Sequence, residues 1–115
     1  MVPETKARVQ YDHVVEADND LVRARKGEFW GFIDKKGNLI IPIIYQMVWD
    51  FKAGLAPVKK NGFWGFINTE GQVVIDFQYD FVYPSGQESF YAQKGEEEKV
   101  IQVRGLVNSE VFSFS

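Results

Sequence analysis

The amino-acid sequence predicts an all-β fold in which three tandem 34-residue units, each a β-hairpin or meander, stack as a small antiparallel repeat array with little or no helix. Three observations support this prediction. The pentapeptide Phe-Trp-Gly-Phe-Ile occurs at residues 29–33 and again at 63–67, a spacing of 34 positions. Turn-forming pairs that contain glycine recur at the same spacing. No segment shows the 3.6-residue apolar period and the caps of a helix.

The spacing divides the chain into a lead-in of residues 1–10 and a single domain, residues 11–115, with units 11–44, 45–78 and 79–112. The first two units are identical at 11 of 34 aligned positions, whereas average composition gives about two by chance. The recurring structural positions are Tyr11, Tyr45 and Tyr79; Trp30 and Trp64; Gly31 and Gly65; and Gly37, Gly71 and Gly105.

The third unit has charged residues where the other two have Phe-Trp-Gly, namely Glu97, Glu98 and Lys99. A charged outer edge is what a repeat array needs in order to stop further stacking. Simple divergence of an old repeat is the alternative explanation. Self-association through the repeat edge is also left open.

Turn residues delimit the strands of each unit. Asn61-Gly62 suits a type I′ hairpin, and Gly27-Glu28 and Gly95-Glu96 suit type II′ at the same place. The segments 34–37 and 68–71 each predict a type I turn closed by a left-handed glycine and a bulge. The strands expected between these turns are Leu21–Lys26, Phe29–Asp34 and Leu39–Ile41, with counterparts 34 residues on, and a short fourth strand near Val48–Phe51.

Side chains alternate along the Phe29–Asp34 strand, and both of its faces are apolar. One face is therefore expected to contact a neighbouring unit. Trp30 is expected to pack against Tyr45 or against a recurring glycine, because a glycine leaves room for the indole ring.

The two complete units carry a longer shared pattern. Unit one has Trp30-Gly31-Phe32-Ile33-Asp34, Gly37 and Ile40-Ile41-Pro42 with Tyr45 after it, and unit two has Gly54-Leu55-Ala56, Val58, Trp64-Gly65-Phe66-Ile67 and Gly71. At these residues the chain resembles the WG repeat family over most of residues 11–82. Unit two departs from the pattern at Asn68 and Asp76, and unit three lacks the Trp-Gly pair.

The resemblance implies a bacterial β-repeat protein without an established catalytic role, of a kind regarded as an interaction module. It supplies no active-site residues.

Charge and composition disfavour several classes of function. The chain has 13 basic and 16 acidic residues, so no overall attraction to nucleic acid is expected. It has no cysteine, which excludes disulfides and thiolate metal sites. The first residues lack the apolar core of a signal peptide, and no apolar run is long enough to span a membrane. A cytoplasmic location is expected for the chain as written, and is left open if it is part of a longer protein.

No residue cluster predicts catalysis, a metal site or a cofactor. His13, the single histidine, aligns with Met47 and Phe81, which indicates a packing position. The segment Asp18-Asn19-Asp20 lacks the glycine and the distal glutamate of a calcium loop, so a solvated turn is favoured. Glu96-Glu97-Glu98 is interpreted as a soluble edge, since acid and base catalysis needs carboxylates that face each other across a cleft.

Binding residues are sought where the units differ, because shared positions are explained by the fold. Trp49 aligns with Val15 and Tyr83, and Phe51 aligns with Ala17 and Ser85. Trp49, Phe51, Tyr83 and Tyr91 are therefore candidates for an aromatic binding strip, with the alternative that these rings fill unequal gaps between units. Arg23, Arg25 and Lys59 could attract an acidic partner, or could protect an exposed strand edge.

The function favoured by the sequence is non-catalytic binding, with another protein as the expected partner. Binding of glycans or cell-envelope components through exposed aromatic rings is one alternative. A small immunity protein that binds a bacterial toxin is another, based on small size, acidity and a composition typical of the cytosol.

Overall fold

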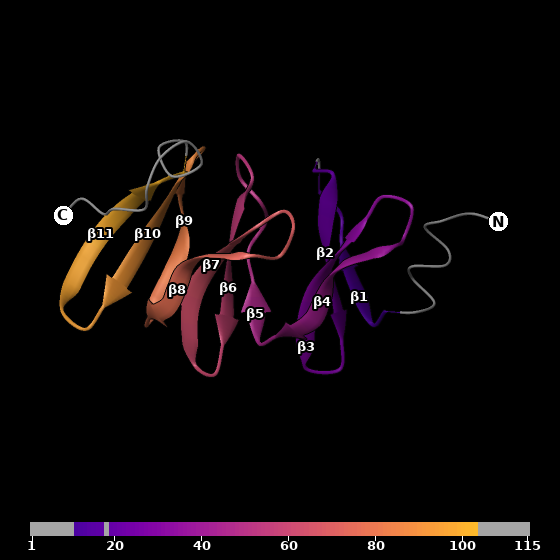
Figure 1. Ribbon diagram of the computed structural model, residues 1–115, viewed down its shortest axis with the longest axis horizontal. Helices are drawn as coiled ribbons and strands as arrows, with labels where there is room; N and C mark the ends of the chain where they lie inside the picture. The colour runs from indigo at the N-terminus through magenta and orange to yellow at the C-terminus, as the bar shows by residue number, and fades with distance from the viewer. Residues whose placement is uncertain (1–10, 18, 104–115) are drawn as a thin grey trace.

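The computed structural model describes residues 11–17 and 19–103, and every element defined in this part of the chain is a β-strand. The strands form three antiparallel sheets (Figure 1). We call them sheet A, with order β1-β2-β3-β4, sheet B, with order β5-β6-β7-β8, and sheet C, with order β11-β10-β9. The all-β prediction is confirmed. Residues 1–10, Asp18 and Gly105, together with the rest of 104–115, lie outside the described residues.

Equivalent strands recur at 34-residue intervals. Sheet A contains β1 (His13–Val15), β2 (Leu21–Lys26), β3 (Phe29–Asp34) and β4 (Leu39–Tyr45). Sheet B contains β5 (Met47–Val48), β6 (Leu55–Lys60), β7 (Phe63–Asn68) and β8 (Val73–Tyr79). Sheet C contains β9 (Phe81–Gly86), β10 (Ser89–Lys94) and β11 (Glu97–Gln102).

The tight hairpins have the predicted backbone. Gly27 and Gly95 have φ values of 66° and 60°, as the first residue of a type II′ turn requires. Asn61 and Gly62 both have positive φ, 54° and 88°, as in type I′. A further contact, which was not predicted, recurs at these turns. The side chain one residue after each repeat tyrosine accepts a hydrogen bond from a backbone N–H of the turn. These bonds are Gly27 to Asp12, Gly62 to Gln46 and Gly95 to Asp80, at 2.7–2.8 Å.

Two strand predictions need correction. Strand β4 continues past the expected Ile41 to Tyr45, and the short strand expected near Val48–Phe51 is Met47–Val48. Pro42 suggested an early end, but β4 passes it with shifts in its register against β3. A proline is tolerated there because such irregular pairing leaves ladder positions unused.

The glycine of the Trp-Gly pair allows the backbone of the next strand, β4, to approach closely. A Cβ on Gly31 would lie 2.4 Å from the carbonyl oxygen of Ile41 and 2.6 Å from that of Pro42. Gly31 therefore leaves room for the backbone of β4. Of the two partners expected for Trp30, a recurring glycine or Tyr45, Tyr45 lies opposite it in the β3–β4 register.

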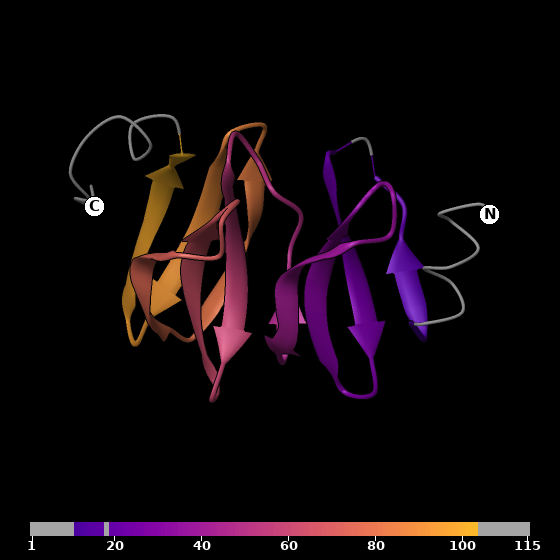
Figure 2. The same ribbon diagram turned by 45° about the vertical axis from the view of Figure 1, so that its right-hand side comes forward.

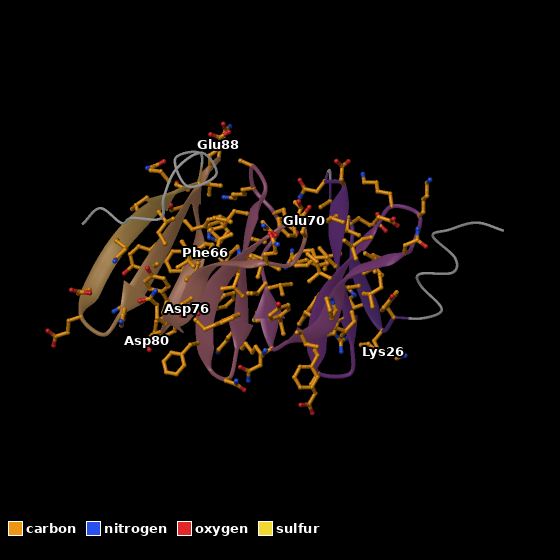
Figure 3. The ribbon with its side chains drawn as sticks, viewed as in Figure 1. Lys26, Phe66, Glu70, Asp76, Asp80 and Glu88 are labelled. Carbon is orange, nitrogen blue, oxygen red and sulfur yellow. The ribbon has the colours of Figure 1, made fainter. Side chains whose placement is uncertain are left out.

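The sheets follow one another along the long axis of the molecule, with sheet B between sheets A and C (Figures 1 and 2). One buried cluster combines residues of sheets A and B, among them Phe32, Ile41, Val58 and Ile67. A second combines sheets B and C, with Phe66 (Figure 3) and Phe90 in ring contact at 5.5 Å. A third, formed by Val22, Ala24 and Ile33, lies on the other face of sheet A. Each sheet thus packs against its neighbour through whole faces.

Candidate functional site

Trp49 lies where the three sheets meet. Its indole Nε1 donates a hydrogen bond of 2.9 Å to the carbonyl oxygen of Val82, in sheet C. Trp49 also contacts sheet A, because the Arg23 guanidinium lies 5.9 Å from the centre of the indole ring. The ring is half-buried and packs against the cluster between sheets B and C. Trp49 is therefore a connecting residue of the stack, which matches the gap-filling alternative.

Arg23 is also engaged at the boundary between sheets A and B. Its Nε donates to Asp50 Oδ1 at 2.8 Å, and the two side chains are 18% and 36% exposed. The guanidinium thus has a carboxylate and an aromatic ring as partners, an arrangement that suits arginine particularly well. Asp50 was not identified from the sequence, although its place directly after Trp49 was a usable signal.

Phe51 is a core residue, so its candidacy as a binding residue is corrected. It is 7% exposed, and its ring contacts that of Phe32 at a centroid distance of 4.7 Å. A ligand cannot reach a ring that is closed in by the packing of two sheets.

Arg25 and Lys59 occupy equivalent positions of β2 and β6, opposite Trp30 and Trp64. Arg25 donates to the carbonyl oxygen of Gly27 at 2.8 Å, a local contact on the surface. Lys59 is half-buried. Arg23, the third cation of this predicted set, is paired with Asp50.

Lys52 makes a second contact between sheets B and C that the sequence did not reveal. Its Nζ lies 4.9 Å from the centre of the Phe90 ring and donates to the carbonyl oxygen of Gly86. Burial lowers the pKa of Lys52, and the nearby Asp50 carboxylate acts in the opposite direction.

Tyr83 and Tyr91 form the most exposed aromatic pair of the predicted set. Their rings stack with centroids 4.7 Å apart and an angle of 27° between the planes. Tyr83 is 48% exposed and Tyr91 is half-buried. The two residues lie opposite each other in β9 and β10, so they share one face of sheet C.

The face that carries this pair points away from sheet B. In β10 and β11, Tyr91 lies opposite Val100, and Gln93 lies opposite Glu98. Val100 is 44% exposed, whereas Phe90 and Ala92, on the other face of β10, are fully buried against sheet B. We call this the end face, defined by Tyr83, Tyr91, Gln93, Glu98 and Val100.

Glu98 belongs to the end face, whereas only a place on a soluble edge was predicted for it. Strand alternation places Glu97 and Glu98 on opposite faces of β11. Partial burial is the main cause that raises the pKa of the Tyr91 hydroxyl, and the Glu98 carboxylate, which accepts its hydrogen bond, adds to the increase. The period of two along β11 was the signal that could have identified Glu98.

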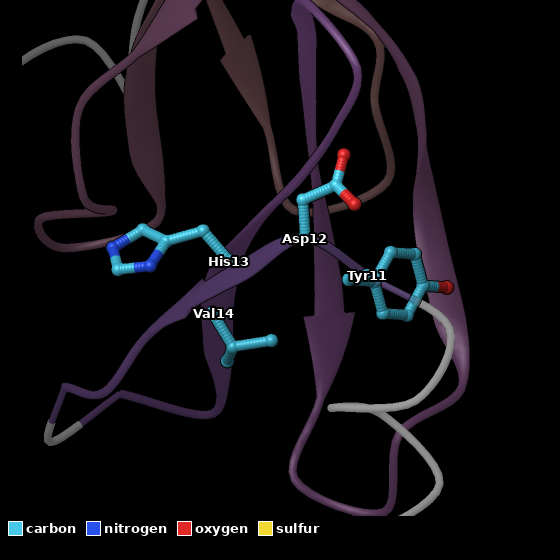
Figure 4. A pocket seen from close by; sticks show the side chains of 4 residues that line it. All are labelled: Tyr11, Asp12, His13 and Val14. Carbon is cyan, nitrogen blue, oxygen red and sulfur yellow. The ribbon is translucent and has the colours of Figure 1, made fainter.

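His13 lines a surface pocket with Tyr11, Asp12 and Val14 (Figure 4). The pocket holds about 190 Å³, less than the roughly 300–1,000 Å³ of ligand sites. Figure 4 shows the His13 imidazole and the Asp12 carboxylate extending away from each other. His13 is exposed, and its ring lies edge-on to that of Trp30, with 6.2 Å between the ring centroids. Packing was predicted at this position, yet Met47 and Phe81 are also 44% and 59% exposed.

Within residues 11–17 and 19–103, no group of three or more potential metal-ligating side chains is arranged to hold an ion. The calcium hypothesis at Asp18-Asn19-Asp20 falls partly on Asp18, outside the described residues. In the same part of the chain, no helix is long and apolar enough to cross a membrane.

Comparison with known proteins identifies the repeat. No match is found among the curated proteins, and none among the solved structures. The family described as "WG containing repeat" matches residues 30–62 and 64–92, segments of 33 and 29 residues that include Trp30-Gly31 and Trp64-Gly65. Because these matches cover 62 of the 115 residues, the chain belongs to the WG repeat family.

Proposed function

We propose that this chain is a non-catalytic interaction module and that it binds another protein through the end face of sheet C. One observation carries the proposal. The equivalent faces of sheets A and B are each covered by the next sheet, and Phe32 and Phe66 are fully buried there. Val100, at the corresponding position of sheet C, is 44% exposed.

The side chains of the end face are suited to contact with a protein. Tyrosine is enriched in protein interfaces because it combines a large apolar ring with a polar hydroxyl at low entropic cost. Tyr83 and Tyr91 support each other by stacking, so their rings are already ordered before a partner binds. Gln93 and Glu98 add polar groups beside them.

The other residues predicted from the sequence support the fold in this proposal. Arg23 and Trp49 are bound to Asp50 and Val82 within the stack. Replacing them is expected to weaken contacts between sheets, and any loss of binding would follow from that. Tyr83 and Tyr91 can be changed without removing a contact between sheets.

The test is site-specific photo-crosslinking in cells, with p-benzoylphenylalanine placed at position 83. The matched control carries the same group at Phe63, which is 46% exposed, compared with 48% for Tyr83, and lies in the β6–β7 hairpin. We expect a defined protein adduct from position 83 that an excess of unlabelled wild-type chain removes, and that position 63 does not give.

Equal adducts at both positions, or none at position 83, would contradict the proposal. A glycan array provides the other arm of the test. Array binding that is lost on Tyr83→Ser, without any protein adduct at position 83, would assign the end face to sugars.

A further inference from the structure

The boundaries between sheets share a chemical feature. At the boundary of sheets A and B, the Arg23 guanidinium lies 5.9 Å from the Trp49 ring centre. At the boundary of sheets B and C, Lys52 Nζ lies 4.9 Å from the Phe90 ring centre. Each boundary thus places a cation of one 34-residue unit over an aromatic ring of the next unit.

The contact of Arg23 is the more complete of the two. Its guanidinium pairs with the Asp50 carboxylate at 2.8 Å and also lies over the indole of Trp49. A planar guanidinium can stack on a ring while its N–H groups bind a carboxylate, which an ammonium group cannot do equally well. The chain itself therefore contains one site, formed by Trp49, Asp50 and Arg23, in which an aromatic ring and a carboxylate together bind a guanidinium.

The end face presents two of these three components. The Tyr83 and Tyr91 rings stack on each other there with centroids 4.7 Å apart. Glu98 lies on the same face, opposite Gln93 and two residues along the strand pair from Tyr91. Within residues 11–17 and 19–103, no cation lies over this tyrosine pair, and Lys99 contacts the ring of Tyr79 instead, at 5.8 Å.

We propose that the end face binds an arginine side chain of the partner protein, with the guanidinium stacked on the Tyr83–Tyr91 pair and paired with the Glu98 carboxylate. This inference rests on the proposed function and specifies the chemistry of the partner. The local charge is in keeping with it, because Glu96, Glu97 and Glu98 outnumber the flanking Lys94 and Lys99 at the β10–β11 turn, and a net negative charge favours a basic segment.

The inference is tested with the whole chain and a short capped glycine peptide that contains one central arginine. Binding is followed by amide chemical shifts in a two-dimensional NMR titration. A peptide with citrulline in place of arginine is the matched control, because citrulline keeps the planar shape and loses the charge. We expect the arginine peptide to shift amides of β9, β10 and β11, with a dissociation constant of roughly 1 mM, and the citrulline peptide to bind about tenfold more weakly.

Two variants separate a specific site from general attraction. Glu98→Gln and Glu97→Gln remove the same charge from adjacent exposed residues, but on opposite faces of β11. We expect Glu98→Gln to weaken binding of the arginine peptide about tenfold, and Glu97→Gln to change it less than about twofold, as screened surface charge predicts. Both variants are expected to melt like the wild type, since neither side chain is buried.

Equal losses in the two variants, equal binding of the citrulline peptide, or shifts outside sheet C would each overturn the arginine site. An adduct at position 83 combined with one of these results would keep the protein-binding function and reject only the arginine. Absence of the adduct together with specific peptide binding would leave the arginine site and remove the proposed protein partner.

Discussion

At the scale of single residues, Trp49 and Tyr83 show how one repeat position acquires two roles. Trp49 directly follows β5, Tyr83 lies within β9, and both project to the same side of their sheets. Trp49 is closed in by sheets A and C, whereas Tyr83 is 48% exposed because no described sheet packs beyond it. Strand alternation predicts the face on which a side chain lies, but only the position of its sheet in the stack determines whether that face is covered.

Gly31 provides a prediction at this scale. Replacing it by alanine should lower the free energy of unfolding by about 1–3 kcal/mol, because the new methyl group would meet the backbone oxygen of Ile41 at 2.4 Å. Backbone cannot move aside as a flexible side chain can. Urea unfolding followed by tryptophan fluorescence measures the change.

The matched control for this variant is Gly86→Ala. A Cβ on Gly86 meets only the Ser89 side chain, with the hydroxyl at 2.7 Å and the Cβ at 4.0 Å. That hydroxyl can rotate away, at the loss of an exposed contact with the Ser85 hydroxyl. We expect a change below about 0.5 kcal/mol, as for ordinary surface substitutions. Equal effects of the two alanines would show that the close approach of β4 to Gly31 is not what requires a glycine.

At the scale of strands and turns, the sequence was most informative where turn chemistry is strict. The bounds of β2 and β3 were predicted to the residue, since Gly27 and the Asp34–Gly37 turn need backbone angles that few residues adopt. The end of β4 was missed because it depends on how this strand crosses Gly31, a contact between segments ten residues apart. Local propensity carries no information on such a crossing.

The Asp34 turn yields a prediction of pH dependence. Hydrogen bonds, chiefly from the backbone N–H of Asn38, lower the pKa of Asp34 from 3.8, although slight burial opposes this. The ionised group therefore stabilises the folded state above the ordinary aspartate pKa, and this stabilisation is lost as the pH falls through the lowered value. Asp34→Asn removes the titration and keeps the acceptor, as Asn68 does in unit two with bonds of 2.9 Å.

The stability of wild type relative to Asp34→Asn should thus decrease between pH 7 and pH 3, measured as urea midpoints. The converse variant, Asn68→Asp, should introduce the same sensitivity to acid at the equivalent turn. Parallel pH profiles for all three proteins would rule out the proposed contribution of the Asp34 carboxylate.

At the scale of the whole molecule, the sheets form a linear stack in which the buried clusters join neighbours only. One cluster joins sheets A and B, and another joins sheets B and C. Stability in such an array is approximately the sum of terms for the units and for their interfaces. The sequence predicted the array from its spacing. It did not predict that the third unit would leave its outer aromatic face exposed, because exposure depends on whether a further sheet packs against that face.

One repeat position is occupied by Phe32 at the boundary of sheets A and B, by Phe66 at the boundary of sheets B and C, and by Val100 at the end of the stack. Substitutions at this position test whether stability is a sum over units and interfaces. Phe66→Ala should cost about 3–5 kcal/mol, as for buried phenylalanines elsewhere, because the ring is fully buried against Phe90. Val100→Ala should lower the free energy of unfolding by less than about 0.5 kcal/mol, since Val100 is 44% exposed.

Native-state hydrogen exchange should show β9–β11 losing protection first in Phe66→Ala, and β1–β4 losing it first in Phe32→Ala, because each variant weakens a different boundary. If both variants instead lowered protection equally in all three sheets, the stack would unfold as one cooperative unit, and the end face could not be altered without effects on the whole molecule.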